Sequence, residues 1–268
     1  MRRIQQQYAH HQGFTLIELV VVIVLLGTLS IGTVQFINDS SVGFANTVER
    51  SELASEAQST VARLTRELRG ALPGSIRVTN TGHCVEFIPA LAASLHIALP
   101  TSTAATSFRL AAISPIPTAT TLRAAVFPAG DLYNLSSNSP ISSPVALSAP
   151  DANNQITASL ASPHQFPSPS PTRRLFLVDS PVSFCTDQRN LWRYQNYGFF
   201  ASQPTPPTLP SIVPSRGLLA EDIANADTYF AVNEAALNRN AIVTVKLALE
   251  RNSTTLVMEQ LIQVRNAP

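Results

Sequence analysis

The apolar residues of this chain follow three successive patterns, and the first is an uncharged run from Leu19 to Asn38. Most residues in this run are Val, Ile or Leu, and none is charged. As a helix of about 20 residues, the run would span about 30 Å, the thickness of the hydrocarbon core of a bilayer. The first pattern therefore predicts a membrane-spanning helix.

In the second pattern, apolar and polar residues are spaced as on an amphipathic helix. Small or apolar residues that step by three and four lie on one face. They are Ala54, Ala57, Val61, Leu64 and Leu68. No proline occurs between Phe14 and Pro73, and Gly70 is a suitable residue to end a helix. We therefore expect one continuous helix from Phe14 to Arg69, about 84 Å long.

The third pattern is the short-period alternation typical of β-strands. It is clearest at Ala241–Glu250 and Leu256–Val264, which predicts a C-terminal antiparallel hairpin. Other runs have strand-like composition but are shorter. They are Cys84–Pro89, Ser107–Ile113, Leu122–Phe127, Arg174–Val178, Val182–Cys185, Leu191–Phe200 and Thr228–Val232.

Segments rich in Ser, Ala, Thr and Pro separate the strand-like runs, and such composition favours loops or polyproline II. We expect solvated connections at Ala90–Ser107, Ala129–Ser143, Pro163–Pro171 and Gln203–Pro214. The predicted fold class is α+β, a long N-terminal helix packed on an antiparallel β-sheet head. The head has about 195 residues, enough for one sizeable core with room for an insertion.

The charges that flank the uncharged run predict its orientation. Arg2 and Arg3 precede it and acidic residues follow from Asp39, so the positive-inside rule places the N-terminus in the cytoplasm. Glu18 stands at the start of the run, where an ionisable group is costly. A secretory signal peptide or a plain single-pass anchor would account for the span, but neither gives Glu18 a role.

The residues Gly13-Phe14-Thr15-Leu16-Ile17-Glu18 resemble the N-terminus of class III signal prepilins. This family includes type IV pilins, minor pilins and type II secretion pseudopilins. In it, a prepilin peptidase cuts after the glycine, and the new N-terminal residue is N-methylated. The resemblance implies cleavage between Gly13 and Phe14, methylation of Phe14, and an assembly role for Glu18.

The resemblance also implies an order of domains along the chain. Residues 1–13 would be a cleaved leader, 14–38 the transmembrane and assembly helix, and 39–70 its amphipathic continuation. Residues 71–268 would form a periplasmic or extracellular β-rich head. The protein would lie in the bacterial inner membrane before assembly, and then in a pilus fibre or its tip at the cell surface.

Several later stretches resemble large minor pilins, in particular the O-type subunit of the mannose-sensitive haemagglutinin (MSHA) pilus and the W-type minor pilins. They are residues 66–78, Cys84–Pro89, Val182–Cys185, Leu191–Tyr194 and the closing hairpin. The resemblance implies a structural subunit of an initiation or tip complex. Its partners would be prepilin peptidase and other pilins, which it would contact through the N-terminal helix. The alternatives are a J-type pseudopilin of type II secretion and a tip adhesin that binds a surface glycan or protein.

Cys84 and Cys185 are the only cysteines, and both follow the span. Outside the cytoplasm a disulfide is the expected state, and two buried free thiols are the alternative. In the chain-entropy model, closing a loop of about 100 residues stabilises the fold by ~4–5 kcal/mol. Neither cysteine belongs to a CxxC motif, which argues against a metal or redox pair.

The remaining residues give little support for catalysis. The sequence has no GxSxG, HExxH, P-loop, dinucleotide-binding or EF-hand motif. The net charge of +1 gives no support for nucleic-acid binding. Glu221-Asp222 could bind a cation, although a solvated turn is favoured because the oxygen spacing of an EF-hand is missing. We expect a protein with no enzymatic activity, cofactor or metal site.

Five aromatic residues follow one another closely in one part of the head. They are Trp192, Tyr194, Tyr197, Phe199 and Phe200. At strand spacing, such residues pack in a core or along a sheet edge more often than they line a ligand surface. We therefore expect them to contribute to packing.

Overall fold

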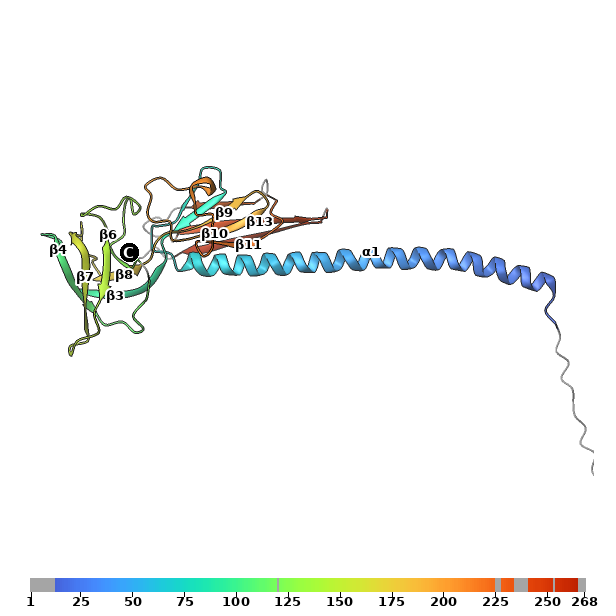
Figure 1. Cartoon of the computed structure of the whole chain (residues 1–268), viewed down its shortest axis with the longest axis horizontal. Helices are drawn as coiled ribbons and strands as arrows, with labels where there is room; N and C mark the ends of the chain where they lie inside the picture. Colours follow the sequence, from blue (N-terminus) through green and yellow to red (C-terminus); the bar gives the residue numbers. More distant parts are fainter. Residues whose placement is uncertain (1–12, 120, 225–227, 234–240, 253, 265–268) are drawn as a thin grey trace, which may run out of the picture. The chain divides into compact units, whose positions relative to one another are not determined.

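The computed structural model describes residues 13–119, 121–224, 228–233, 241–252 and 254–264. Except for Gly13, the predicted leader 1–13 lies outside the described residues. The chain divides into two compact units, residues 1–51 and 52–268. Figure 1 shows a long N-terminal helix and a β-rich region, which is the predicted α+β fold class.

Helix α1 (Leu16–Arg69) is one α-helix of 54 residues that contributes to both units. It begins two residues after the predicted start because Thr15 is its N-cap. The Thr15 hydroxyl accepts a hydrogen bond from the Glu18 N–H at 3.3 Å. The helix ends at Arg69, and the Gly70 N–H then donates to the Glu67 carbonyl at 3.0 Å.

Within unit 52–268, one face of α1 is buried against β-sheets. The buried residues of α1 are Leu53, Ala57, Thr60, Val61, Leu64 and Leu68. All of them except Thr60 belong to a core cluster with residues of two β-sheets, including Val85, Phe184 and Val243. The predicted helix face is therefore confirmed, with Leu53 more deeply buried than the half-buried Ala54.

Two antiparallel sheets share this core cluster. The first has the order β1-β2-β9-β10-β11 and comprises β1 (Arg77–Val78), β2 (Cys84–Phe87), β9 (Val182–Asp187), β10 (Asn190–Tyr194) and β11 (Arg216–Ala220). The second comprises β12 (Tyr229–Asn233), β13 (Ala241–Arg251) and β14 (Thr254–Val264) in sequence order. Strands β13 and β14 pair from Ala241↔Val264 to Arg251↔Thr254, so the predicted C-terminal hairpin is confirmed.

The green and yellow strands in Figure 1 form a closed barrel in the order β3-β4-β7-β6-β5-β8. They are β3 (Ala90–Ala98), β4 (Ala105–Ala111), β5 (Arg123–Val126), β6 (Ile141–Leu147), β7 (Gln155–His164) and β8 (Arg174–Val178). The barrel has its own core, in which the Phe108 and Phe166 rings lie edge to face at 5.7 Å. Among the described residues, the head therefore has one core packed on α1, a separate barrel core and two smaller clusters.

The barrel is an insertion between two strands that pair with each other. Strand β2 precedes all barrel strands and β9 follows them, yet β2 and β9 are antiparallel neighbours. Cys84 lies directly opposite Cys185 in this pair. The room for an insertion that the length of the head suggested is thus occupied by a complete barrel.

Several predicted connections are wrong because they contain barrel strands. The predicted loop Ala90–Ser107 contains β3 and the start of β4, and Ala129–Ser143 overlaps β6. The predicted loop Pro163–Pro171 begins inside β7. Strands β7 and β11 were not predicted, and the predicted strand Leu191–Phe200 ends at Tyr194. In Gln203–Pro214 the only regular element is a 3-10 turn at Pro206–Thr208.

Small side chains explain these errors. In β7 the buried residues Ile156, Ala158 and Leu160 alternate with exposed Thr, Ser and Ala residues. This alternation has the period of a strand, but Ala and Ser have weak intrinsic strand preference. Hydrogen-bonded pairing with the neighbouring strands β4 and β6 stabilises the extended conformation that local preference alone does not favour.

Candidate functional site

The predicted cleavage site lies in an open, non-helical stretch ahead of α1. Residues 13–15 have no regular secondary structure, and 79% of the Phe14 surface is exposed. A Cβ atom built on Gly13 would meet no other atom within 4 Å. Because proteases cut exposed, irregular segments most readily, the Gly13–Phe14 bond is placed where an enzyme can reach it.

Glu18 occupies the first turn of α1, three residues after the Thr15 N-cap. Its backbone N–H is satisfied by the Thr15 hydroxyl, and its carboxylate lies near the positive end of the helix dipole. Thr15 was not singled out from the sequence. The signal was present, because Thr-x-x-Glu ahead of an apolar run is the pattern of a capping box.

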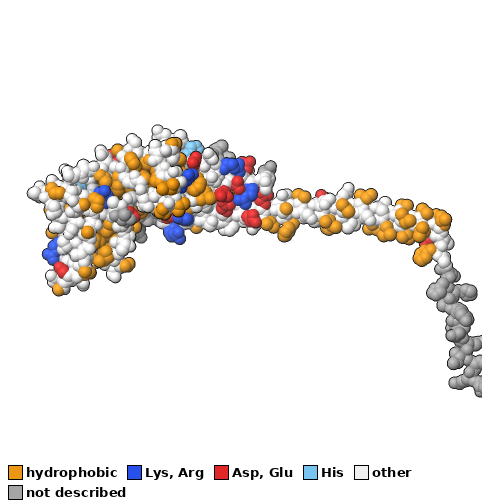
Figure 2. Space-filling view, in the orientation of Figure 1, with side chains coloured by type: hydrophobic (Ala, Val, Ile, Leu, Met, Phe, Trp, Pro, Cys, Tyr) orange, Lys and Arg blue, Asp and Glu red, His pale blue; other side chains and the backbone are white. Residues whose placement is uncertain are grey.

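After Glu18, the first half of α1 exposes an unusual amount of apolar surface. Leu29 is 66% exposed and Phe36 is 71% exposed. Figure 2 shows hydrophobic side chains along the visible face of this stretch. By length and composition, the helix is long and apolar enough to cross a membrane. An apolar surface of this size is typical of contact with lipid or with other subunits.

The Ser and Thr hydroxyl groups of this stretch donate hydrogen bonds to backbone carbonyls of the preceding helical turn. Thr28 donates to the Leu25 carbonyl at 2.9 Å, Ser30 to Leu26 at 2.7 Å and Thr33 to Leu29 at 2.8 Å. In lipid, an unsatisfied polar group would cost several kcal/mol. Glu18 is the charged residue of this stretch, so in an apolar environment its carboxylate is the group that most needs an external partner.

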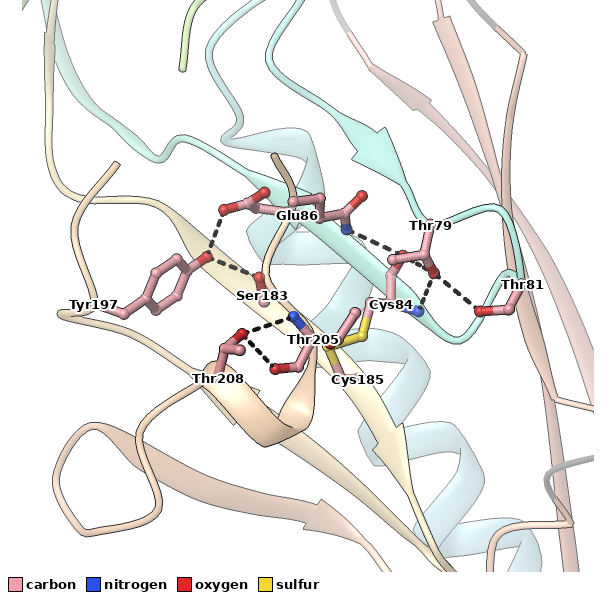
Figure 3. Close-up of a disulfide and its surroundings, with 10 residues drawn as sticks. Thr79, Thr81, Cys84, Glu86, Ser183, Cys185, Tyr197, Thr205 and Thr208 are labelled. Atoms are coloured by element: carbon pink, nitrogen blue, oxygen red, sulfur yellow. Dashed lines mark hydrogen bonds between the residues drawn. A yellow bond between two sulfur atoms is a disulfide. The ribbon is translucent and has the colours of Figure 1, made fainter. Parts of the chain in front are cut away.

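In the head, the predicted disulfide between Cys84 and Cys185 is confirmed, as Figure 3 shows. The two Cα atoms are 4.1 Å apart, and both cysteines are buried. The bond joins β2 to β9, the strands that precede and follow the inserted barrel in the sequence. The disulfide therefore links two strands that are neighbours in the sheet although the cysteines are 101 residues apart in the sequence.

A buried carboxylate, Glu86, lies two residues beyond the disulfide on β2. Its oxygens accept hydrogen bonds from the Arg77 Nε–H at 2.5 Å and the Tyr197 hydroxyl at 2.9 Å. The Ser183 hydroxyl lies 2.7 Å from the same Tyr197 hydroxyl, and Figure 3 shows how the three side chains meet. Burial raises the pKa of Glu86, although both partners favour the carboxylate. Burial and the nearby Glu86 charge also raise the pKa of Tyr197.

Residues 8–34 match the model of the prokaryotic N-terminal methylation motif. The chain carries a prepilin-type N-terminus. The match covers Gly13, Phe14, Glu18 and the first part of the uncharged run, so it includes the stretch whose geometry is described above. A motif of this kind implies processing by a prepilin peptidase and assembly with pilins. Searches of curated proteins and of solved structures find no match to the chain.

The motif also indicates a membrane-anchoring role for the apolar half of α1. A type IV pilin-like signal is followed by a helix that anchors the protein in a membrane, and α1 has the required length and composition. The cleavage site, the methylated residue and the role of Glu18 remain predictions for this chain.

The remaining candidate residues do not form a metal site. The Asp222 carboxylate accepts hydrogen bonds from Arg251 at 2.7 Å and Arg189 at 3.2 Å. The Arg251 hydrogen bond lowers the pKa of Asp222. Glu221 contributes its backbone N–H, which donates to Glu56 at 2.9 Å. Arginine thus occupies the space beside Asp222, and the described residues contain no group of three metal-binding side chains.

The aromatic cluster does not form one continuous ligand surface. Tyr194 is buried beside the disulfide, whereas Phe200 is 48% exposed. Trp192 stacks against the Arg216 guanidinium at 3.6 Å, and Phe199 packs near Tyr133. Trp192 and Tyr194 pack from a strand as expected, whereas Tyr197, Phe199 and Phe200 lie beyond the end of β10, so the predicted strand spacing is wrong for these three.

Proposed function

We propose that this chain is a structural minor pilin, without enzymatic activity, of an MSHA-like type IV pilus. In this proposal it is cut after Gly13 and methylated on Phe14. The observation that carries the proposal is an exposed apolar helix whose only charged residue ahead of Asp39 is Glu18. The methylation motif over residues 8–34 supports the same function.

The proposed role of Glu18 is to set the register between neighbouring subunits. Cleavage gives Phe14 a free amine, which is positively charged near neutral pH. When helices pack side by side in lipid, the carboxylate of one subunit and the amine of the next satisfy each other. Either group left unpaired in an apolar environment would be strongly penalised, so misaligned packing is disfavoured.

The proposed place of the subunit is an initiation or tip complex, reached from the inner membrane. The head would face the periplasm and later the exterior. The barrel between β2 and β9 supports this placement, because it enlarges the head beyond the sheets that pack on α1. A bulky head is easier to accommodate at the end of a fibre than in every repeat along it.

Processing can be tested by producing the chain with a prepilin peptidase and analysing its N-terminus by mass spectrometry. We expect a mature chain that begins at methylated Phe14. Gly13→Val should remain uncut, while Gly27→Ala, a change in open space within α1, should be processed normally. A mature N-terminus after Gly32 would instead indicate an ordinary signal peptide and contradict the proposal.

A deletion strain distinguishes a pilus subunit from a secretion pseudopilin. We expect loss of surface pili with normal export of secreted enzymes, restored by a plasmid copy of the gene. Loss of export with normal pili would assign the chain to a type II secretion system. Neighbouring genes for an MSHA-type pilus would support the first outcome.

A further inference from the structure

One wall of the barrel contains a pocket of about 290 Å³, lined by both apolar and polar side chains, that plays no part in the proposed assembly. Strands β5, β6 and β7 and the segment before β6 supply its lining. Its polar lining includes Arg123, Ser137, Ser142, Ser162 and His164. Five serines contribute to the pocket, and no carboxylate lines it.

Arg123 brings a positive charge to this pocket without an anionic partner. Its Nη1 donates to the Ser142 carbonyl at 2.7 Å, and its guanidinium lies 5.3 Å from the centre of the Phe199 ring. Its Nε is buried without a hydrogen-bond partner. Among the ion pairs of the described residues, none involves Arg123.

A half-buried charge without a counter-ion is unfavourable, which makes Arg123 unusual in this molecule. Removing a charge from water costs several kcal/mol unless an opposite charge and hydrogen bonds compensate. Burial accordingly lowers the pKa of the Arg123 guanidinium. Arg109 on the neighbouring barrel wall is different, because it is largely exposed and pairs with Asp151 at 3.2 Å.

Other groups around the pocket are suited to a ligand that carries both an anion and hydroxyls. Ser137 and Ser162 are exposed, and their hydroxyls make no hydrogen bond to the described residues. The buried His164 ring contacts the Ser139 carbonyl through Nε2 at 2.9 Å. Burial lowers the pKa of His164, so the ring adds no second charge near neutral pH.

We propose that this pocket binds an acidic sugar, with the ligand carboxylate on Arg123 and the ligand hydroxyls on the serines. Arginine is well matched to carboxylates, because its planar guanidinium offers several N–H donors in fixed geometry. A volume of about 290 Å³ lies just below the usual range for ligand sites. It suits one sugar residue rather than an extended chain.

The proposal can be tested with the full chain in detergent micelles, using glucuronate as the probe and glucose as the neutral control. By titration calorimetry we expect saturable glucuronate binding with a Kd on the order of 1 mM, since one charged pair and a few hydrogen bonds provide limited affinity. Glucose should bind at least tenfold more weakly. Arg123→Gln should weaken glucuronate binding at least tenfold, whereas Arg109→Gln should leave it unchanged.

Two further measurements separate lost binding from lost folding. Arg123→Gln removes an uncompensated charge, so its Tm should equal or exceed that of the wild-type chain. Ser162→Leu leaves Arg123 in place and narrows the pocket from an exposed position, and it should also weaken binding at least tenfold. Absence of saturable binding, or equal binding by the Arg123 and Arg109 variants, would overturn the proposal. Acetate binding as tight as glucuronate would overturn the assignment to a sugar.

Discussion

The two halves of α1 have similar apolar residues but opposite surroundings. In the first half, Leu29 and Phe36 expose 66% and 71% of their surface, whereas Leu64 and Leu68 in the second half are 0% exposed. The second half finds its partner within its own chain, in a core shared with two sheets. The first half has no such partner among the described residues, so its apolar surface is available to lipid and to other subunits.

This difference separates two uses of the same physical effect. Apolar surface buried within a chain stabilises a fold, at roughly 25 cal/mol per Å². Apolar surface left exposed along a helix favours insertion into lipid or packing against another subunit. Substitutions in the two halves should therefore affect different measurements, folding of the head in one case and assembly in the other.

We expect the largest effect from Glu18→Val in the first half. Incorporation into sheared pili, measured by immunoblot, should fall at least tenfold because the amine of a neighbouring subunit loses its partner. Processing at Gly13 should remain intact. The matched control is Asp39→Asn, which removes the acid at the other end of the uncharged run and should leave incorporation unchanged. Wild-type incorporation of the Glu18 variant would contradict the role proposed for Glu18.

The next effect concerns the head alone. Replacing both Cys84 and Cys185 by alanine should lower the free energy of unfolding by ~4–5 kcal/mol, because the open loop gains entropy in the unfolded chain. The fluorescence of Trp192, the only tryptophan, reports head unfolding during a denaturant titration. Membrane insertion and processing should be unchanged in the same variant. A head of unaltered stability would show that the strand pair β2–β9 does not depend on the disulfide.

A direct comparison of the two halves uses the same substitution in each. Leu64→Ala should destabilise the head by about 3 kcal/mol, because it opens a cavity in a fully buried site. Leu29→Ala should change head stability by less than about 0.5 kcal/mol, since its side chain is exposed. Equal effects of the two changes on head unfolding, followed by Trp192 fluorescence, would disprove the proposal that only the second half of α1 stabilises the head.

The division along α1 was predictable because helical periodicity is a local property of the sequence. The uncharged run, the apolar face of the second half and the C-terminal hairpin all appear as patterns with a defined period. The cleavage motif, Glu18 and the cysteines were also visible, since each depends on residue identity at one place in the chain.

The barrel was harder to predict because its strands owe their form to distant partners. Residues such as Ala124 and Ala158 fill its interior, and alanine gives no strong strand signal. Within β3, Leu91 and Leu95 are 42% and 52% exposed, so the large apolar side chains of this strand point away from the barrel core. The ion pairs of Arg251 with Glu56 and Asp222 also join residues that are far apart in the sequence, so no local pattern indicates them.

Glu86 provides a pH-dependent test of the head. Its pKa is raised on folding, so the folded state holds a proton that the unfolded state releases at intermediate pH. Stability from this group is therefore fully present below the unfolded pKa and declines as pH rises through the folded pKa. In thermal melts between pH 4 and 8, the Tm of the wild-type chain relative to Glu86→Gln should decrease with increasing pH. Parallel Tm curves would contradict this, because Asp151 and Asp222 contribute equally to both chains.

The smallest expected effect is at the N-cap of α1. Thr15→Val keeps the size of the side chain but removes the oxygen that accepts from the Glu18 N–H, which should cost the first turn about 1 kcal/mol. In detergent, amide exchange at residues 16–18 should become about fivefold faster, while head unfolding stays unchanged. Thr33→Val is the matched control. It removes a hydroxyl that donates to the Leu29 carbonyl in the helix interior, away from the N-terminal turn, so exchange at residues 16–18 should not change. If exchange is unaffected, Thr15 does not order Glu18, and the position of this carboxylate must come from contacts made only after assembly.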